Sequence, residues 1–230
     1  MTSASYAFDR RRILAGIVAT GAAGLLPAAV QAQSLGGLGL SSILGKATDS
    51  ALDKLAQPGA FYNDEDIRIG LPIIGKPRRG LFGSILGAAN QLGVLDGVTR
   101  SINEAAGTAA GEAKPIFRDA IDGLSFSDAP GIIREADGGT QYLRRSSKDA
   151  LHYKLEPLVD SALEKLGVYE QFDGLADKHS FIRQAGLDRE SINYSVTDQG
   201  LDGIFAYVGS EERAFRKNPL GNVLSDILGK

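Results

Sequence analysis

Two groups of polar residues in this sequence have types and spacings that could do chemistry. The first follows the pair Gly138-Gly139, where Tyr142, Arg144 and Arg145 come in quick succession. A helix that begins there places the arginines at its positive end, which disfavours cations, so we expect a carboxylate to offset Arg144. The candidates are Asp128, Asp202 and Glu212. Two arrangements fit: an anion site made of Arg144, Tyr142 and backbone N–H groups, or an internal salt bridge, which we favour because such pairs often fix helix register.

The second group lies on a strong helical pattern over residues 197–217 and consists of Asp202, Glu211, Glu212 and Arg216. Neighbouring carboxylates could serve as a general acid and base or hold a divalent cation. However, adjacent residues of a helix point about 100° apart, which argues against a shared metal. Glu212 and Arg216 are four residues apart in the favourable orientation for an ion pair. We therefore predict no metal site.

The sequence lacks the residues and motifs that several kinds of functional site require. It has no cysteine, which excludes disulfides, zinc thiolate sites, iron–sulfur clusters and thiol nucleophiles. There is no G-x-S-x-G elbow, phosphate-binding P-loop or dinucleotide fingerprint, so we predict no cofactor. His152 and His179 are isolated, and we interpret Asp64-Glu65-Asp66 as a solvated loop. The net charge of −3 gives no basic footprint for nucleic acid.

Residues 1–32 have the pattern of an export signal and not of a folded element. Arg10, Arg11 and Arg12 precede an apolar run over 13–26, and Val30-Gln31-Ala32 supplies small residues for cleavage after Ala32. The arginines resemble the twin-arginine signal, with general secretion as the alternative. The apolar run is short for a membrane span, so we expect no stable anchor after cleavage and a periplasmic protein. Cleavage leaves 27 acidic and 22 basic residues, a net charge of −5.

The elements that must position these residues are helices, because apolar residues recur at spacings of three and four. We predict a flexible start over 33–40 and one all-α domain over 41–228, an irregular bundle of about seven helices with a short extended segment near 66–72. The expected helices cover 41–55, 77–92, 96–110, 112–124, 140–166, 197–217 and 220–228, with a polar region over 169–195 that holds a short helix at best. Pro157 should kink or break the helix that contains it.

The stretch Gly123–Arg145 is predicted to join two long amphipathic helices. Ser125 or Ser127 can cap a short helix, with Asp128 at its positive end. Gly138-Gly139 should end that helix, and Thr140 should cap the next one.

Several strings in order resemble one bacterial family. They are Arg100-Ser-Ile-Asn103-Glu-Ala105-Ala106, Ile116-Phe117-Arg-Asp-Ala120-Ile121, Ser125-Phe126-Ser-Asp128-Ala129-Pro-Gly131-Ile132-Ile133, Thr140-Gln-Tyr142-Leu143-Arg144, Gly200-Leu201-Asp202-Gly203-Ile204-Phe205, and Glu211-Glu212 with Arg216-Lys-Asn218-Pro219. Their order and spacing are similar to those of "domain of unknown function 4197", over about residues 38–228. The resemblance implies a mostly α-helical exported protein and supplies no agreed activity.

We therefore expect a non-enzymatic ligand-binding, protein-binding or structural role in the periplasm, with an unknown small molecule or protein as partner. The alternative is a hydrolase-type enzyme that uses Arg144 and the carboxylates of the 197–217 helix. The candidate binding or structural cluster consists of Arg100, Asn103, Asp128, Tyr142, Arg144, Asp202, Glu212 and Arg216.

Overall fold

The computed structural model describes residues 28–71, 95–125, 132, 134–184 and 187–217, with side chains from Gly39 onward except those of Phe181 and Gln184. Its helices are α1 (Ala28–Leu55), α2 (Ala60–Asn63), α4 (Asp96–Glu112), α5 (Lys114–Asp122), α7 (Gly138–Lys165), α8 (Val168–Lys178), α9 (Ser180–Gln184) and α10 (Arg189–Lys217). These ranges contain no strand. The predicted all-α class and multi-helix architecture are confirmed.

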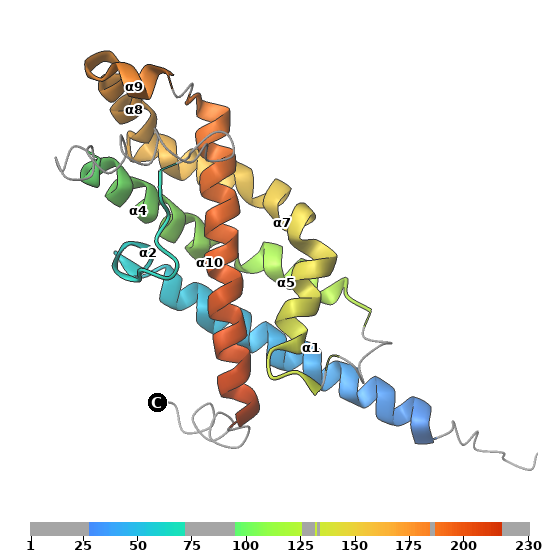
Figure 1. Ribbon diagram of the computed structural model, residues 1–230. Coiled ribbons are helices and arrows are strands. Elements are labelled where there is room, and N and C mark those ends of the chain that lie inside the picture. Colours follow the sequence, from blue (N-terminus) through green and yellow to red (C-terminus); the bar gives the residue numbers. More distant parts are fainter. Residues whose placement is uncertain (1–27, 72–94, 126–131, 133, 185–186, 218–230) are drawn as a thin grey trace, which may run out of the picture.

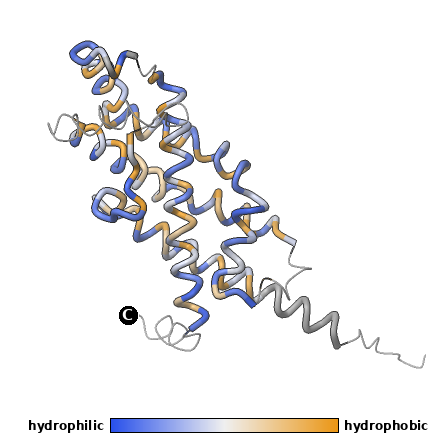
Figure 2. Tube along the Cα trace, viewed as in Figure 1, coloured by the Kyte–Doolittle hydropathy of each residue, from blue (hydrophilic) through white to orange (hydrophobic). Residues whose placement is uncertain are grey.

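Helix α10 is the central element of this bundle. It packs most extensively against α1 and α7 and also contacts α4, whereas α8 and α9 lie together at one end (Figure 1). Apolar and hydrophilic residues alternate around the helices, as amphipathic packing requires (Figure 2). One continuous core joins buried side chains from α1, α4, α5, α7, α8 and α10. A polar residue on α10 can therefore meet partners on several helices.

Helix α4 is lined with small side chains where it enters this core. Ala105, Ala106, Ala109 and Ala110 are all buried, and so is Gly107. A Cβ atom on Gly107 would lie 3.1 Å from the backbone oxygen of Leu55 in α1. The small residues thus allow the close helix approach that their composition suggests.

Two helices begin earlier than the apolar pattern indicates. Helix α1 starts at Ala28, not Ser41, and runs through residues 33–40. Helix α10 starts at Arg189, not Thr197, because Asp188 provides its first turn with a cap. The Asp188 carboxylate accepts hydrogen bonds from the Ser191 backbone N–H, at 2.8 Å, and from the Ser191 hydroxyl. The predicted processing site after Ala32 stays a prediction.

The region 169–195 is more helical than predicted. Helices α8 and α9 occupy much of it, and Val168 and Phe172 anchor α8 in the core. Gly167 separates α7 from α8 in a left-handed conformation, with φ of 64°, that glycine adopts without strain. Pro157 is exposed within α7, and the helix continues through it, so the predicted break does not occur.

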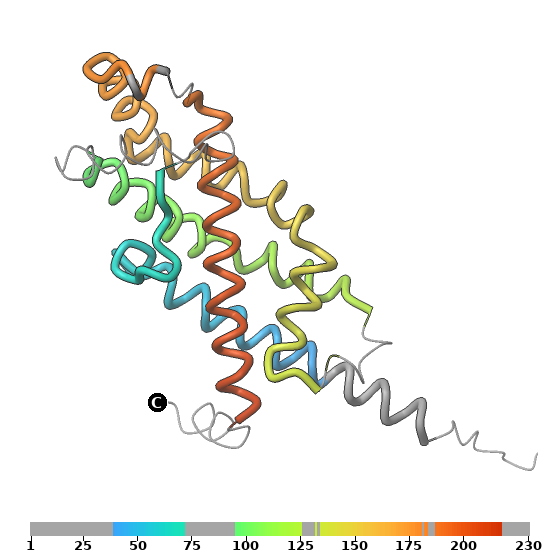
Figure 3. The backbone as a smooth tube through the Cα atoms, in the orientation of Figure 1, coloured from blue at the N-terminus to red at the C-terminus, as the bar shows by residue number. Residues whose placement is uncertain are grey.

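Residues 68–71 have neither helix nor strand structure and lie across α4 and α10, as the teal segment after α2 shows in Figure 3. The short extended segment predicted near 66–72 is thus non-helical over residues 68–71, whereas Asp66 and Ile67 lie in a turn. The predicted helices over 77–92 and 220–228, and the cap at Ser127 and Asp128, lie outside the described residues. None of the described helices is long and apolar enough to cross a membrane.

Candidate functional site

The Glu212 carboxylate lies at the first turn of α7, and its residue is completely buried. One oxygen, Oε1, accepts a hydrogen bond from the Gly139 backbone N–H at 3.0 Å. The other, Oε2, accepts bonds from the Thr140 N–H and hydroxyl, both at 2.7 Å. The start of a helix leaves N–H groups without partners and favours negative charge. Glu212 therefore caps α7 from a different helix.

This cap changes the predicted role of the glycine pair. Gly138 and Gly139 begin α7 instead of ending a helix, and Thr140 lies within the first turn instead of capping it. The side chain at the N-cap position, Asp137, makes no capping hydrogen bond. A Cβ atom on Gly139 would lie 2.8 Å from the Glu212 Oε1 atom, so only glycine leaves space for this carboxylate.

Two arginines of α10 complete the contacts at this junction. Arg216 donates to Glu212 from Nε at 2.9 Å and from Nη2 at 2.5 Å, which is the predicted four-residue pair. Arg213 pairs with Asp137, whose carboxylate also accepts a bond from the Gln141 side chain at 2.8 Å. The junction is thus a network in which each carboxylate meets a cation and an N–H donor.

Arg144 pairs with Asp202, one of the three carboxylates predicted for it. The Arg144 Nη2 atom lies 2.6 Å from the Asp202 Oδ1 atom, and the guanidinium lies over the Phe205 ring, 5.5 Å from its centroid. Lys148, one turn along α7, contacts the same carboxylate at 3.1 Å and that of Asp198 at 3.0 Å. The hydrogen bond to Asp198 raises the pKa of Lys148 above its usual value. The arginine therefore acts as an interhelical salt bridge.

These contacts belong to a longer interface that we call the polar seam, which runs between α7 and α10. Its α7 residues follow at intervals of four: Arg144, Lys148, His152, Glu156, Asp160 and Glu164. The His152 ring packs against that of Tyr194 in a tilted arrangement, with centroids 4.5 Å apart, and the Glu156 backbone oxygen accepts a bond from the Asn193 side chain. The antiparallel pairing of α7 with α10 is thus specified by charge as well as by apolar packing.

The far end of the seam is centred on Asp160. Arg189 donates two hydrogen bonds to its carboxylate, at 3.0 and 2.7 Å, and the Tyr169 hydroxyl donates another at 2.7 Å. The Arg189 bond holds the pKa of Asp160 below its usual value. Burial, followed by the bond to Asp160, raises the pKa of Tyr169. Both groups therefore keep fixed charge states near neutral pH.

The other members of the predicted cluster lie elsewhere. The Tyr142 hydroxyl donates to the backbone oxygen of Ser125 at 2.8 Å. Arg100 lies over the ring of Tyr62, 4.1 Å from its centroid, and pairs with Asp96. Asp96 is the first residue of α4. Asp128 lies outside the described residues. The cluster therefore separates into distinct sites.

The carboxylates of α10 also point to different neighbours. Asp202 meets α7 through Arg144, and Glu212 meets the first turn of α7. Glu211 faces α1, where it accepts hydrogen bonds from Ser50, at 2.8 Å, and Lys54, at 2.5 Å. This divergence follows from the angle between adjacent helix positions. The three carboxylates do not converge on one reaction centre.

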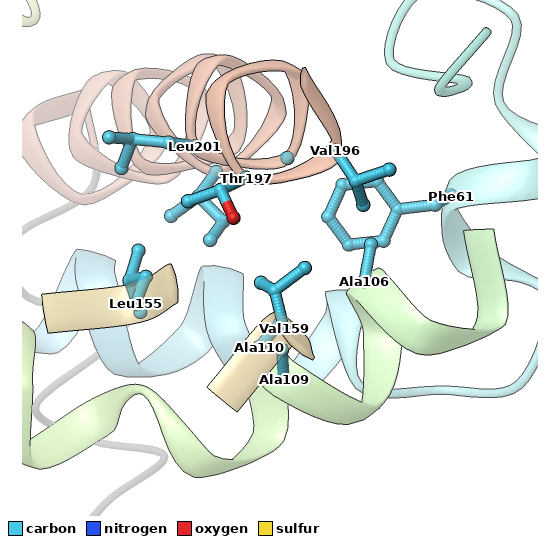
Figure 4. A pocket seen from close by; sticks show the side chains of 11 residues that line it. Phe61, Ala106, Ala109, Ala110, Leu155, Val159, Val196, Thr197 and Leu201 are labelled. Carbon is cyan, nitrogen blue, oxygen red and sulfur yellow. The ribbon is translucent and has the colours of Figure 1, made fainter. Parts of the chain in front are cut away.

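The described residues enclose a cavity of only about 10 Å³, lined by Phe61, Ala106, Ala109, Ala110, Leu155, Val159, Val196, Thr197, Gly200, Leu201 and Ile204 (Figure 4). This is near the smallest volume that holds one water molecule, and the lining is mostly apolar. Larger hollows are open to solvent, such as the groove beside Phe215 and Lys54, of about 490 Å³, and that beside Phe172 and Ile182, of about 310 Å³.

Sequence reasoning missed the roles of three residues, Lys148, Gln199 and Asn103. Nothing in the sequence around Lys148 indicates its partners on α10. Its position four residues after Arg144, on the same helix face, is the one signal that could have suggested them. Gln199 exchanges hydrogen bonds with the backbone of Gly70, and Asn103, singled out only by the family resemblance, does the same with Ile69. Their partners are distant in sequence, so only a three-dimensional structure reveals them.

Comparison with known proteins supplies a family but no activity. No curated protein and no solved structure matches the chain. A family model described as "Protein of unknown function (DUF4197)" matches residues 31–230. The match begins two residues before the predicted processing site and includes all described helices except the first residues of α1. The chain therefore belongs to the DUF4197 family.

Proposed function

We propose that this chain is an exported, non-enzymatic protein that works in the periplasm by binding a protein partner. One observation carries this proposal: the polar side chains that could take part in chemistry, those of Arg144, Asp202 and Glu212, all bind partners within the chain. Arg144 and Asp202 pair with each other, and Glu212 is enclosed by α7 and Arg216. The enclosed cavity of about 10 Å³ has room for at most one water molecule. A partner would therefore meet the outer surface.

The hydrolase alternative has less support from this geometry. A hydrolytic site needs a nucleophile or activated water between groups held within hydrogen-bond reach of it. Arg144 contacts one carboxylate of α10, whereas the other two face α1 and the first turn of α7. No single described cleft receives all three groups.

The test of binding is native mass spectrometry of the full-length protein purified gently from periplasm. The proposal predicts an additional mass in the protein range that dissociates at high salt or with collisional activation. A bare chain mass across several growth conditions, together with measurable hydrolysis of model esters or phosphoesters, would favour the enzyme alternative.

Arg144→Ala separates a structural from a binding role for this residue. The pair is half exposed, with 46% of the Arg144 and 42% of the Asp202 side chain accessible. Such pairs contribute at most about 1 kcal/mol, so unfolding should shift little and partner capture should persist. Loss of the partner at unchanged stability would instead make Arg144 part of the interface. Lys154→Ala, at an exposed position of the same helix, is the matched control.

Export is tested separately by cell fractionation. Changing Arg10 and Arg11 to Lys should retain the protein in the cytoplasm if the twin-arginine route carries it. Continued appearance in the periplasm would assign it to general secretion.

A further inference from the structure

The bond at which export processing is predicted lies inside a helix of the full-length chain. Helix α1 begins at Ala28, so Ala32 and Gln33 belong to its second turn. In an α-helix, each backbone N–H donates to the C=O four residues earlier, and residues 33–36 therefore use the oxygens of residues 29–32. Hydrolysis of the Ala32–Gln33 bond consumes one water molecule and leaves a carboxylate on Ala32 and an ammonium group on Gln33. It also removes all the acceptors of residues 33–36.

The end that this hydrolysis creates is unfavourable for a helix. A helix start favours negative charge, whereas the new end carries the positive Gln33 ammonium group. Residues 33–48 contain no aspartate or glutamate, so no carboxylate near this end of the sequence offsets that charge. Ser34 can cap the new end, and a serine cap favours the helix by about fivefold. Whether the first turns stay helical therefore depends on the residues that follow Ser34.

The residues that follow are rich in glycine, namely Gly36, Gly37 and Gly39. Relative to alanine, each glycine favours unwinding by about fourfold to fivefold, so the three together favour it by about 60- to 130-fold. This exceeds the effect of one serine cap. Within a continuous helix, unwinding also breaks hydrogen bonds on both sides of the glycines, whereas at a helix end residues can unwind one by one. The same glycines are therefore helical in the full-length chain and unwound after processing.

Packing explains the glycine at position 45 of α1 but not the one at position 39. A Cβ atom on Gly45 would collide with the Arg118 guanidinium, which pairs with Asp49. A Cβ atom on Gly39 would have no described atom within 4 Å. Gly39 is thus not required for a close contact among the described residues, and its main effect is on helix stability.

The part of α1 that packs in the core begins directly after these glycines. Leu40 is only 4% exposed, and Leu44 and Ala47 are completely buried. Unwinding that reached these side chains would expose apolar surface to water, so it should stop near Leu40. Ser41 and Ser42 follow at this point, and either hydroxyl can cap the shortened helix.

We propose, building on the export proposed above, that processing after Ala32 shortens α1, so that this helix begins near Ser41 in the processed chain. Residues 33–40 are then helical only while the export signal is attached. This change accounts for the difference between the sequence and the structure at α1. The apolar pattern describes the helix of the processed chain, and the start at Ala28 belongs to the full-length chain.

Amide hydrogen exchange on the full-length chain and on a chain that begins at Gln33 tests this proposal. The amides of residues 36–39 should exchange at least tenfold faster in the shorter chain, because their helix has lost its first turn. The amides of residues 44–55 and of α10 should exchange equally in both chains, which shows that both are folded. Equal protection of residues 36–39 in the two folded chains would overturn the proposal.

Alanine at the three glycines tests the cause of the shortening. In the chain that begins at Gln33, changing Gly36, Gly37 and Gly39 to Ala should slow exchange of these amides by at least tenfold. Gly174→Ala in α8 is the matched control, because its Cβ also has no described atom within 4 Å, and it should leave the rates at residues 36–39 unchanged. An unchanged rate in the triple variant would reject the role of the glycines.

The mass of the protein purified from periplasm tests export independently of the helix. A first residue of Gln33 supports processing at the predicted bond. A periplasmic chain that begins elsewhere, or a chain that stays in the cytoplasm, would reject this processing event. The exchange experiment would still decide whether α1 depends on residues 28–32, so the two failures are distinguishable.

Discussion

Replacing Glu212 with Gln tests whether the junction between α7 and α10 is a structural lock. The two carboxylate oxygens accept five hydrogen bonds, three at Oε1 from Gly139 and Arg216 and two at Oε2 from Thr140. A glutamine amide of the same shape has one oxygen and one NH₂ group. An NH₂ group at the Oε1 position faces three donors, and one at the Oε2 position faces the Thr140 N–H, although the Thr140 hydroxyl can turn to accept from it. In either orientation, the charge that balances the guanidinium is lost.

The expected loss follows from the burial of this group. Removing one partner of a buried ion pair costs about 3–5 kcal/mol, and each buried donor left without an acceptor costs about 1–3 kcal/mol. We therefore expect Glu212→Gln to lower the free energy of unfolding by about 3–5 kcal/mol. This is a large share of the roughly 5–15 kcal/mol typical of folded proteins.

Urea denaturation followed by circular dichroism at 222 nm measures this loss. The midpoint should fall while the slope of free energy against urea stays constant, since the folded state remains compact. Glu211→Gln, at the adjacent position, is the control and should cost no more than about 1 kcal/mol because its partners Ser50 and Lys54 lie near solvent. A Glu212→Gln chain within about 1 kcal/mol of wild type would refute the structural role and return Glu212 to the candidates for a binding site.

Further predictions concern two glycines of α10 and the hydroxyl of Tyr207. Gly200→Ala should raise the free energy of unfolding by about 1 kcal/mol, because alanine favours the helix and its Cβ has normal contacts at 3.7 and 3.9 Å. Gly203→Ala should lower it by about 1–3 kcal/mol, because its Cβ meets Phe61 at 3.0 Å; equal effects of both changes in thermal melts would contradict this. The bond to Asp64 raises the pKa of Tyr207 from 10.0 to about 12, so its stabilisation should be complete below pH 10 and be lost as pH rises to 12. Tyr207→Phe should remove the component at pH 12 from the absorbance titration at 295 nm, and an unchanged titration would assign that component to another tyrosine.

The sequence alone predicts those parts of the structure that depend on local pattern. The 3.6-residue period identifies the α-helical class and the buried face of α10, including Leu201, Ile204 and Val208. Asp202, one of the three carboxylates named for Arg144, is its partner. The dipole argument behind that prediction is not met, because α7 begins at Gly138 and Arg144 therefore lies in its second turn. The helical period succeeds because it depends only on residues within one helix.

Two errors arise from a long-range contact and from an overlooked local signal. Thr140 looks like an N-cap, but the cap comes from Glu212, which lies 72 residues later in the chain. Helix α10 begins at Arg189 because of Asp188 and Ser191, a short polar signal within a region that lacks a clear apolar stripe. The hydrogen bonds of Asn103 and Gln199 could not be predicted for the same reason, because their partners are backbone groups of a segment distant in the sequence.

The position of α10 also determines the order in which the molecule can be completed during synthesis. It is the last described helix, yet it contacts α1, α4 and α7 and supplies the carboxylate that caps α7. Until the ribosome has produced residues up to about 212, the earlier helices have no partner for much of their apolar surface. A nascent chain therefore cannot reach its native state segment by segment, and its apolar surfaces stay prone to aggregation until α10 has been made.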